Sequence, residues 1–137
     1  MLNYKSISTF LGIIIIISIS ACDPHGGYEY WIDNQSDSII FVSYSQYSQD
    51  SINIRELDKG EMFLLTQFST HGGLHDDGDN FLVWFDSLGV YIDTAKMIEI
   101  SKDYTDRNSW DYEQEVTGMM GKAGENIYKL TIRNEDL

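Results

Sequence analysis

Cysteine and positive charge are both scarce in this sequence. A single cysteine among 137 residues cannot form an intramolecular disulfide, so the folded part must be held together by packing alone. Nine lysines and arginines stand against 22 aspartates and glutamates, which gives a formal net charge of -13. A surface of this sign repels phosphate backbones, and nucleic acid is therefore not an expected partner.

Recognisable catalytic motifs and helical periodicity are also lacking. The sequence holds no Gly-x-Ser-x-Gly nucleophile elbow, which an α/β-hydrolase would need. Its one cysteine is placed for another role, so a Cys/His catalytic pair is not expected. No segment sustains the 3.6-residue period of an amphipathic helix. We therefore expect a non-catalytic protein that needs no cofactor.

The one long hydrophobic run lies at the N-terminus, at residues 10–19. It is about half the roughly 20 apolar residues that span a bilayer, which is typical of a signal peptide. Lys5 supplies the positive charge before it, and the small residue Ala21 precedes Cys22. The pattern predicts a signal peptide over residues 1–21 and lipidation of Cys22, with an uncleaved anchor as the alternative.

Residues 22–27 contain the only proline and two adjacent glycines, which predicts a short flexible tether. Residues 28–137 are the length of one domain with one hydrophobic core. We expect this domain to be held at the cell envelope, at the outer membrane, with its lipid anchor as the contact to the bilayer. The leaflet that it faces stays open.

Alternating polar and apolar residues recur along this domain. Tyr28, Tyr30 and Ile32 share one face of a predicted strand, as do three residues near the C-terminus. Turn residues separate such runs every 8 to 12 residues, a spacing typical of a β-sandwich or barrel. The nine predicted strands are 28–33, 38–45, 51–57, 61–68, 81–86, 89–93, 97–100, 110–116 and 126–133.

The fold class that we expect is therefore all-β: a single antiparallel β-sandwich, immunoglobulin-like or similar, with a small barrel as the alternative. Gly89 can adopt positive φ, which predicts a tight hairpin between the strands 81–86 and 89–93. Residues 101–109 are polar and predict a short helical turn, capped by Ser101 or Asp103.

The polar loop between residues 71 and 80 concentrates two of the three histidines with three aspartates. Imidazole and carboxylate groups are suitable ligands for zinc and other divalent ions. The metal hypothesis assigns His71, His75, Asp77 and Asp79 as ligands and would make this loop the centre of a metal-dependent enzyme. The alternative is an ordinary solvated turn.

Exposed aromatic rings would offer a second kind of site, because sugar rings stack on tryptophan and tyrosine faces. Core packing is the default for most of these side chains, including Trp31 and Trp84. Tyr47 and Trp110 lie at loop or strand ends, so they are the two residues that we assign to ligand stacking.

Four triplets read aspartate, then serine or threonine, then a small or aliphatic residue. Their hydroxyl residues are Ser38, Ser51, Ser87 and Thr94. The triplets resemble the O-glycosylation sites of exported Bacteroidota proteins, which makes these four hydroxyls candidate attachment sites. Asp-Ser is also common in turns before strands, and this explains the placement equally well.

The sequence Ile19-Ser20-Ala21-Cys22 resembles the lipobox of bacterial lipoproteins. Together with the Asp-Ser/Thr triplets and the polar C-terminal end, residues 128–136, it resembles the small single-domain lipoproteins of Bacteroidota. The resemblance implies a β-sandwich without catalytic residues. We expect a binding or accessory module for a glycan or a protein partner; the alternatives are the metal-dependent enzyme and a structural subunit of a surface assembly.

Overall fold

The computed structural model describes residues 25–95, 97–117 and 123–137. The predicted signal peptide, residues 1–21, and Cys22 lie outside the described residues. The described ranges form eight strands and three short 3-10 helices: β1 (His25–Asn34), β2 (Ile40–Gln46), β3 (Asn53–Leu57), β4 (Met62–His71), η1 (Gly78–Asn80), β5 (Phe85–Asp93), β6 (Ile98–Glu99), η2 (Arg107–Ser109), β7 (Asp111–Val116), β8 (Gly124–Ile132) and η3 (Asn134–Asp136). Within these ranges, no helix has the length and apolar character needed to cross a bilayer.

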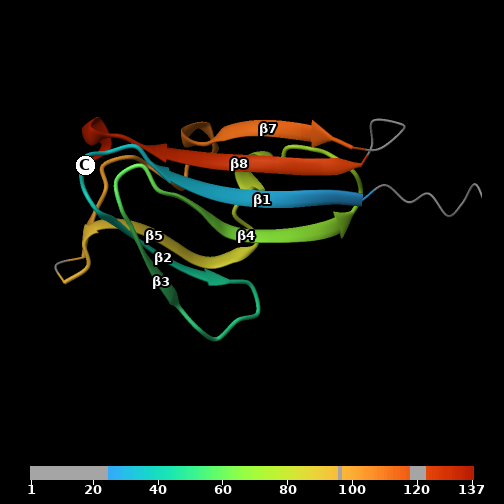
Figure 1. Cartoon of the computed structure of the whole chain (residues 1–137). Helices are drawn as coiled ribbons and strands as arrows, with labels where there is room; N and C mark the ends of the chain where they lie inside the picture. The colour runs from blue at the N-terminus through green and yellow to red at the C-terminus, as the bar shows by residue number, and fades with distance from the viewer. Residues whose placement is uncertain (1–24, 96, 118–122) are drawn as a thin grey trace, which may run out of the picture.

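The strands form two four-stranded sheets that pack against each other (Figure 1). One sheet has the order β4-β1-β8-β7, and the other has the order β3-β2-β5-β6. The all-β sandwich prediction is confirmed. The alternative of a closed barrel is wrong, because each sheet keeps two separate edges.

One pairing departs from the predicted antiparallel arrangement. β1 and β8, the first and last strands, lie side by side at the centre of their sheet and run parallel. The other five pairings between the described strands are antiparallel. Alternation within a strand reveals which face is buried but carries no information about the direction of a neighbour almost 100 residues away, so this pairing was not predictable.

The core fills the space between the sheets, as the alternation predicts. Tyr28, Tyr30 and Ile32 on β1 are at most 2 % exposed. The corresponding face of β8, made by Tyr128, Leu130 and Ile132, is fully buried. The rings of Tyr30 and Tyr128 stack with centroids 5.1 Å apart. This core is unusually aromatic, and the polar ends of its tyrosines must find partners inside the protein.

The predicted hairpin around Gly89 is wrong. Residues 85–93 form the single strand β5, and the four residues before it form a turn. Gly89 is not in a turn but allows the Tyr91 side chain to lie close to the backbone. A Cβ atom at position 89 would lie 2.5 Å from the Tyr91 hydroxyl oxygen. The glycine therefore makes room for a neighbouring ring on the same face of the strand.

The short helical turn predicted in residues 101–109 is present as η2, but neither predicted cap is used. Asp106 is the N-cap residue, and its side chain accepts a hydrogen bond from the Asn108 backbone amide at 2.9 Å. Asp103 instead closes a local turn by accepting from the Thr105 amide at 2.9 Å. Ser101 donates its hydroxyl to the carbonyl oxygen of Asp136 at 3.0 Å.

The last three residues of the predicted tether belong to the sheet. His25, Gly26 and Gly27 begin β1 and pair with the end of β4. The glycines allow neighbouring atoms to approach the strand closely and do not make a flexible tether. A Cβ atom on Gly27 would lie 1.6 Å from a carboxylate oxygen of Glu125. The Glu125 side chain would have to move to admit a larger residue at Gly27, whereas at Gly26 a Cβ atom would lie 2.3 Å from the backbone oxygen of Gly73.

Candidate functional site

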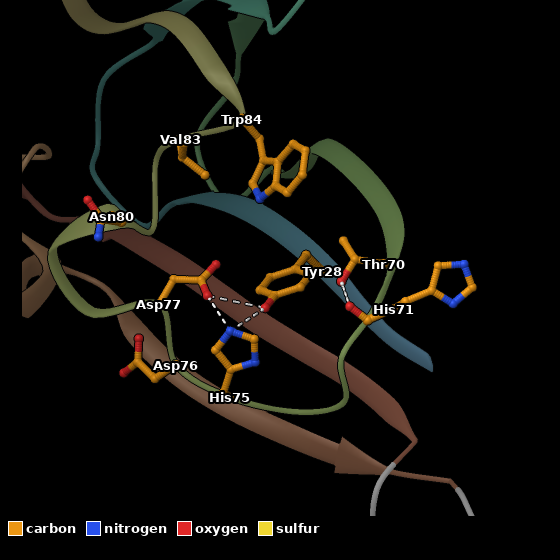
Figure 2. A pocket seen from close by; sticks show the side chains of 9 residues that line it. All are labelled: Tyr28, Thr70, His71, His75, Asp76, Asp77, Asn80, Val83 and Trp84. Carbon is orange, nitrogen blue, oxygen red and sulfur yellow. Dashed lines mark hydrogen bonds and ion pairs between the residues drawn. The ribbon is translucent and has the colours of Figure 1, made fainter. Parts of the chain in front are cut away.

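Two adjoining pockets open beside Trp84. The larger, which we call the histidine pocket, has a volume of about 550 Å³. The smaller, the tyrosine pocket, has a volume of about 260 Å³. Thr70 and Trp84 line both pockets, which are therefore neighbours, and we refer to the two together as the depression. The histidine pocket is lined by Tyr28, Thr70, His71, His75, Asp76, Asp77, Asn80, Val83 and Trp84 (Figure 2). The tyrosine pocket is lined by Gln46, Tyr47, Thr66, Gln67, Phe68, Ser69, Thr70 and Trp84.

An ion pair fixes one wall of the histidine pocket. Arg107 donates from Nε to one oxygen of Asp76 at 2.9 Å and from a terminal nitrogen to the other oxygen at 2.6 Å. The guanidinium also lies over the Tyr128 ring, 5.0 Å from its centroid. A bidentate pair of this kind is short and directional. It ties the polar loop after β4 to η2, so the loop is anchored although most of its residues are exposed.

Hydroxyl groups of buried tyrosines also hold the polar loop after β4. The Tyr128 hydroxyl accepts from the Asp77 backbone amide at 2.9 Å and donates to Asp76 at 3.1 Å. The Tyr30 hydroxyl donates to the carbonyl oxygen of Phe81. Burial raises the pKa of both tyrosines, with nearby charges adding to the effect. The hydroxyls therefore stay protonated and act as structural donors.

His75 and Asp77 meet in the centre of the histidine pocket. Nε2 of His75 lies 2.8 Å from one oxygen of Asp77. The Tyr28 hydroxyl donates to that same oxygen at 3.3 Å, as Figure 2 shows. Burial first, and then the neighbouring charge of Asp77, raises the pKa of Tyr28 to about 12. These contacts engage one nitrogen of His75, one oxygen of Asp77 and the hydroxyl of Tyr28, and they hold the three side chains in fixed relative positions.

The predicted metal site is not assembled. His75 and Asp77 come together, but the His71 ring points away from the pocket, and Asp79 lies exposed on η1. Across the described ranges, no three histidine, cysteine, aspartate or glutamate side chains converge on a point where one ion would bind. The physical reason is the course of the loop, which brings only His75 and Asp77 of the four residues into contact. The four residues together do not fit a metal centre.

Asp76→Asn tests whether the ion pair stabilises the loop. Arg107 holds the pKa of the Asp76 carboxyl below its ordinary value, so the stabilisation is present at neutral pH and is lost as the pH falls through that lowered pKa. Because the Asp76 side chain is 37 % exposed, we expect a loss of only about 1–2 kcal/mol at pH 7. Urea denaturation at pH 7 and below pH 4 measures the difference.

Asp79→Asn is the matched control for this variant, because it removes a carboxylate from the same loop at an exposed position. We expect it to leave the urea midpoint unchanged. A destabilisation of Asp76→Asn that stays constant down to acid pH would contradict a contribution from the charge and would point to a purely steric effect.

The tyrosine pocket has a different chemical character. Its lining residues carry amide, hydroxyl and aromatic groups and no ionisable acid or base apart from the phenol of Tyr47. Tyr47 is 67 % exposed, as predicted for a stacking residue. Its backbone amide donates to the Trp84 carbonyl oxygen at 2.8 Å, and the Gln49 amide closes the turn onto the Gln46 carbonyl at 3.0 Å. The exposed ring therefore stands on a fixed backbone.

The prediction for Trp110 is wrong. Its side chain is 3 % exposed, and its indole nitrogen donates to the carbonyl oxygen of Tyr104 at 2.8 Å. The position just before β7 suggested a surface residue, but the preceding turn folds over the indole and supplies its polar partner. Trp110 is a core residue and takes no part in ligand stacking.

The four candidate glycosylation hydroxyls are all exposed. Ser38 lies in the turn before β2, Ser51 lies before β3, and Thr94 lies in the turn after β5. Ser87 is within β5, where its hydroxyl lies 2.8 Å from that of Ser45. An enzyme that attaches a sugar needs access to the residue, and all four residues meet this requirement. O-glycosylation at these positions stays a prediction.

Sequence reasoning found Tyr47, His71, His75 and Asp77 and missed the rest of the depression. The amide and hydroxyl groups of the tyrosine pocket come from β2 and β4, which belong to different sheets. No local pattern could bring them together, since their proximity follows from how the sheets pack. No protein-family model, curated protein or solved structure matches this chain.

Proposed function

We propose that this protein is a lipid-anchored envelope protein that binds a neutral glycan in the tyrosine pocket. The observation that carries the proposal is the uncharged lining of this pocket in a chain with a formal net charge of -13. A cationic ligand would favour acidic walls and an anionic ligand basic ones. A neutral ligand rich in hydroxyl groups matches amides, hydroxyls and an aromatic face.

Tyr47 supplies the stacking face. Its ring is exposed, while the turn that carries it is closed by backbone hydrogen bonds. Because the backbone of the turn is already ordered, a sugar that covers the ring has to restrict only the side-chain rotation of Tyr47, and the entropy cost of binding stays small.

Gln46 on β2 and Gln67 on β4 both line the pocket. Nε2 of Gln67 donates to a carboxylate oxygen of Glu29 at 2.9 Å, and Oε1 of Gln46 accepts from Gln49 at 3.0 Å, so each amide keeps only part of its hydrogen-bonding capacity for a ligand. An amide both donates and accepts, which suits the paired donor and acceptor character of sugar hydroxyls. Thr66 and Thr70 lie in the same lining, from alternate positions of β4. A ligand longer than one sugar can extend past Trp84 into the histidine pocket, because this side chain lines both.

Three versions of the full chain, produced in a bacterium that processes lipoproteins, test the proposal. The probes are radioactive palmitate and an array of neutral polysaccharides, with an acidic polysaccharide for comparison. The wild type is expected to take up label and to bind a neutral polysaccharide. Tyr47→Ala keeps the label and loses about tenfold in affinity, the value of one stacked ring. Cys22→Ser loses the label and keeps the binding.

Each part of the proposal can fail separately in this experiment. Palmitate incorporation into Cys22→Ser would overturn the lipid anchor. Retention of the acidic polysaccharide alone, or equal binding by wild type and Tyr47→Ala, would overturn the glycan site. Thermal denaturation of Tyr47→Ala is the folding control; little change is expected because the side chain is exposed.

A further inference from the structure

His25 and His71 form a pair across two strands. They are directly opposite each other in the antiparallel ladder of β1 and β4. Both side chains are exposed, and their ring centroids lie 4.7 Å apart with the planes tilted by 47°. The pair lies at the end of the sheet where the described chain begins. It is separate from the His75–Asp77 contact, in which Nε2 of His75 is engaged.

This spacing matches the geometry of two imidazoles on one metal ion. When both nitrogens lie about 2.0–2.1 Å from the ion and the ligand angle is between tetrahedral and square, the ring centroids are about 4.4–5.2 Å apart. The observed 4.7 Å falls within this range. Opposite side chains on paired strands have restricted relative positions, so the two rings are held close to each other before an ion arrives.

We propose that His25 and His71 bind one divalent transition-metal ion, with water in the remaining coordination positions. Imidazole selects zinc, copper and nickel over calcium and magnesium, which prefer oxygen ligands. The strongly acidic chain raises the local concentration of cations around such a site. This inference is independent of the proposed glycan binding, since neither of the two residues is Tyr47 or one of the amides of the tyrosine pocket.

Calorimetric titration with zinc chloride, and separately with nickel chloride, tests the site. The protein is the full chain in detergent with Cys22→Ser as background, so that no thiolate competes, and without a histidine tag. One ion is expected to bind per chain. His25→Ala and His71→Ala should each lower the affinity about tenfold or more, because one of two protein ligands is lost.

His75→Ala is the matched control: it removes the third histidine of the chain without touching the pair, and binding should be unchanged. Calcium chloride should give no heat at the same concentrations. Absence of zinc and nickel binding at millimolar concentration would overturn the site, as would affinity that survives the double variant His25→Ala, His71→Ala. A loss confined to His75→Ala would place the ion in the histidine pocket and would equally overturn it.

Discussion

Asn34→Ala is expected to lower the free energy of unfolding by about 3 kcal/mol or more, although the change removes only a small polar side chain. Asn34 is fully buried at the end of β1. The two hydrogens of its amide nitrogen are shared among three carbonyl oxygens, those of Ser38 at 2.9 Å, Leu57 at 3.0 Å and Asp58 at 3.1 Å.

The side-chain oxygen of Asn34 completes the network. It accepts from the Ser36 backbone amide at 3.1 Å and from the Ser36 hydroxyl at 2.7 Å. One side chain therefore joins the end of β1, the following turn, and the connection from β3 to β4, which crosses between the sheets. Alanine would leave several buried polar groups without partners, and each such group costs about 1–3 kcal/mol.

Urea denaturation of Asn34→Ala beside Gln35→Ala measures this effect. Gln35 is the exposed neighbour in the same turn, so its variant should stay within about 0.5 kcal/mol of the wild type. If Asn34→Ala does not fold, Ser36→Ala, which removes only one hydroxyl from the network, should still lose about 1 kcal/mol. Equal stability of Asn34→Ala and Gln35→Ala would contradict the role of the network.

Asn34 also shows that a local sequence pattern can predict a turn without predicting which of its side chains are buried. Residues 34–37 carry amide, hydroxyl and carboxylate side chains that are typical of a turn, and the chain does leave β1 here. Nothing in the four residues distinguishes a solvated asparagine from a buried one. Asn34 is buried because residues 57–58, more than 20 positions later in the sequence, pack against it. The contribution of a polar side chain to the free energy of unfolding therefore depends on contacts that are distant in the sequence.

The same distinction separates the correct strand predictions from the wrong ones. Alternation in β1 and β8 predicted which side chains are buried, because the period of two is a property of the strand itself. The parallel pairing of β1 with β8 depends on the whole fold. The freedom of Gly89 to adopt positive φ favours a turn, whereas in the fold this glycine leaves space for the Tyr91 ring.

The candidate site was partly predictable for a related reason. Tyr47 and the polar loop after β4 stand out by composition, so their residues could be named in advance. Arg107 could not be, because its partner Asp76 is 31 positions away. The predicted metal ligands were the right residue types in the wrong arrangement: the fold pairs His71 with His25 and His75 with Asp77.

Trp110→Ala is the second large effect that we expect, a loss of about 3–5 kcal/mol. The indole is buried, its ring centroid lies 5.5 Å from that of Phe81 and 6.3 Å from that of Tyr30, and its nitrogen donates to Tyr104. Alanine would leave a cavity beside the aromatic core and a carbonyl without its donor. Against a total stability of about 5–15 kcal/mol, this loss brings the chain close to unfolding.

Trp31→Ala provides the comparison within the same residue type. Trp31 is partly exposed on β1, and its indole nitrogen donates to Glu29 on the same strand, so its loss should be about 1 kcal/mol. Trp110→Phe fills most of the volume and should fall between the two alanine variants. Equal urea midpoints for Trp31→Ala and Trp110→Ala would place Trp110 at the surface and contradict its burial.

The Trp110 variant also connects the core to the pockets. Trp110 contacts Phe81, and the Phe81 carbonyl receives the Tyr30 hydroxyl from β1. Arg107, which holds Asp76 in the wall of the histidine pocket, donates a further hydrogen bond to the Trp110 carbonyl oxygen at 2.8 Å. Loss of the indole should therefore loosen the loop after β4 before the sandwich unfolds. Hydrogen exchange at residues 75–81 in Trp110→Phe, which still folds, should be faster than in the wild type, while exchange in β2 should be unchanged.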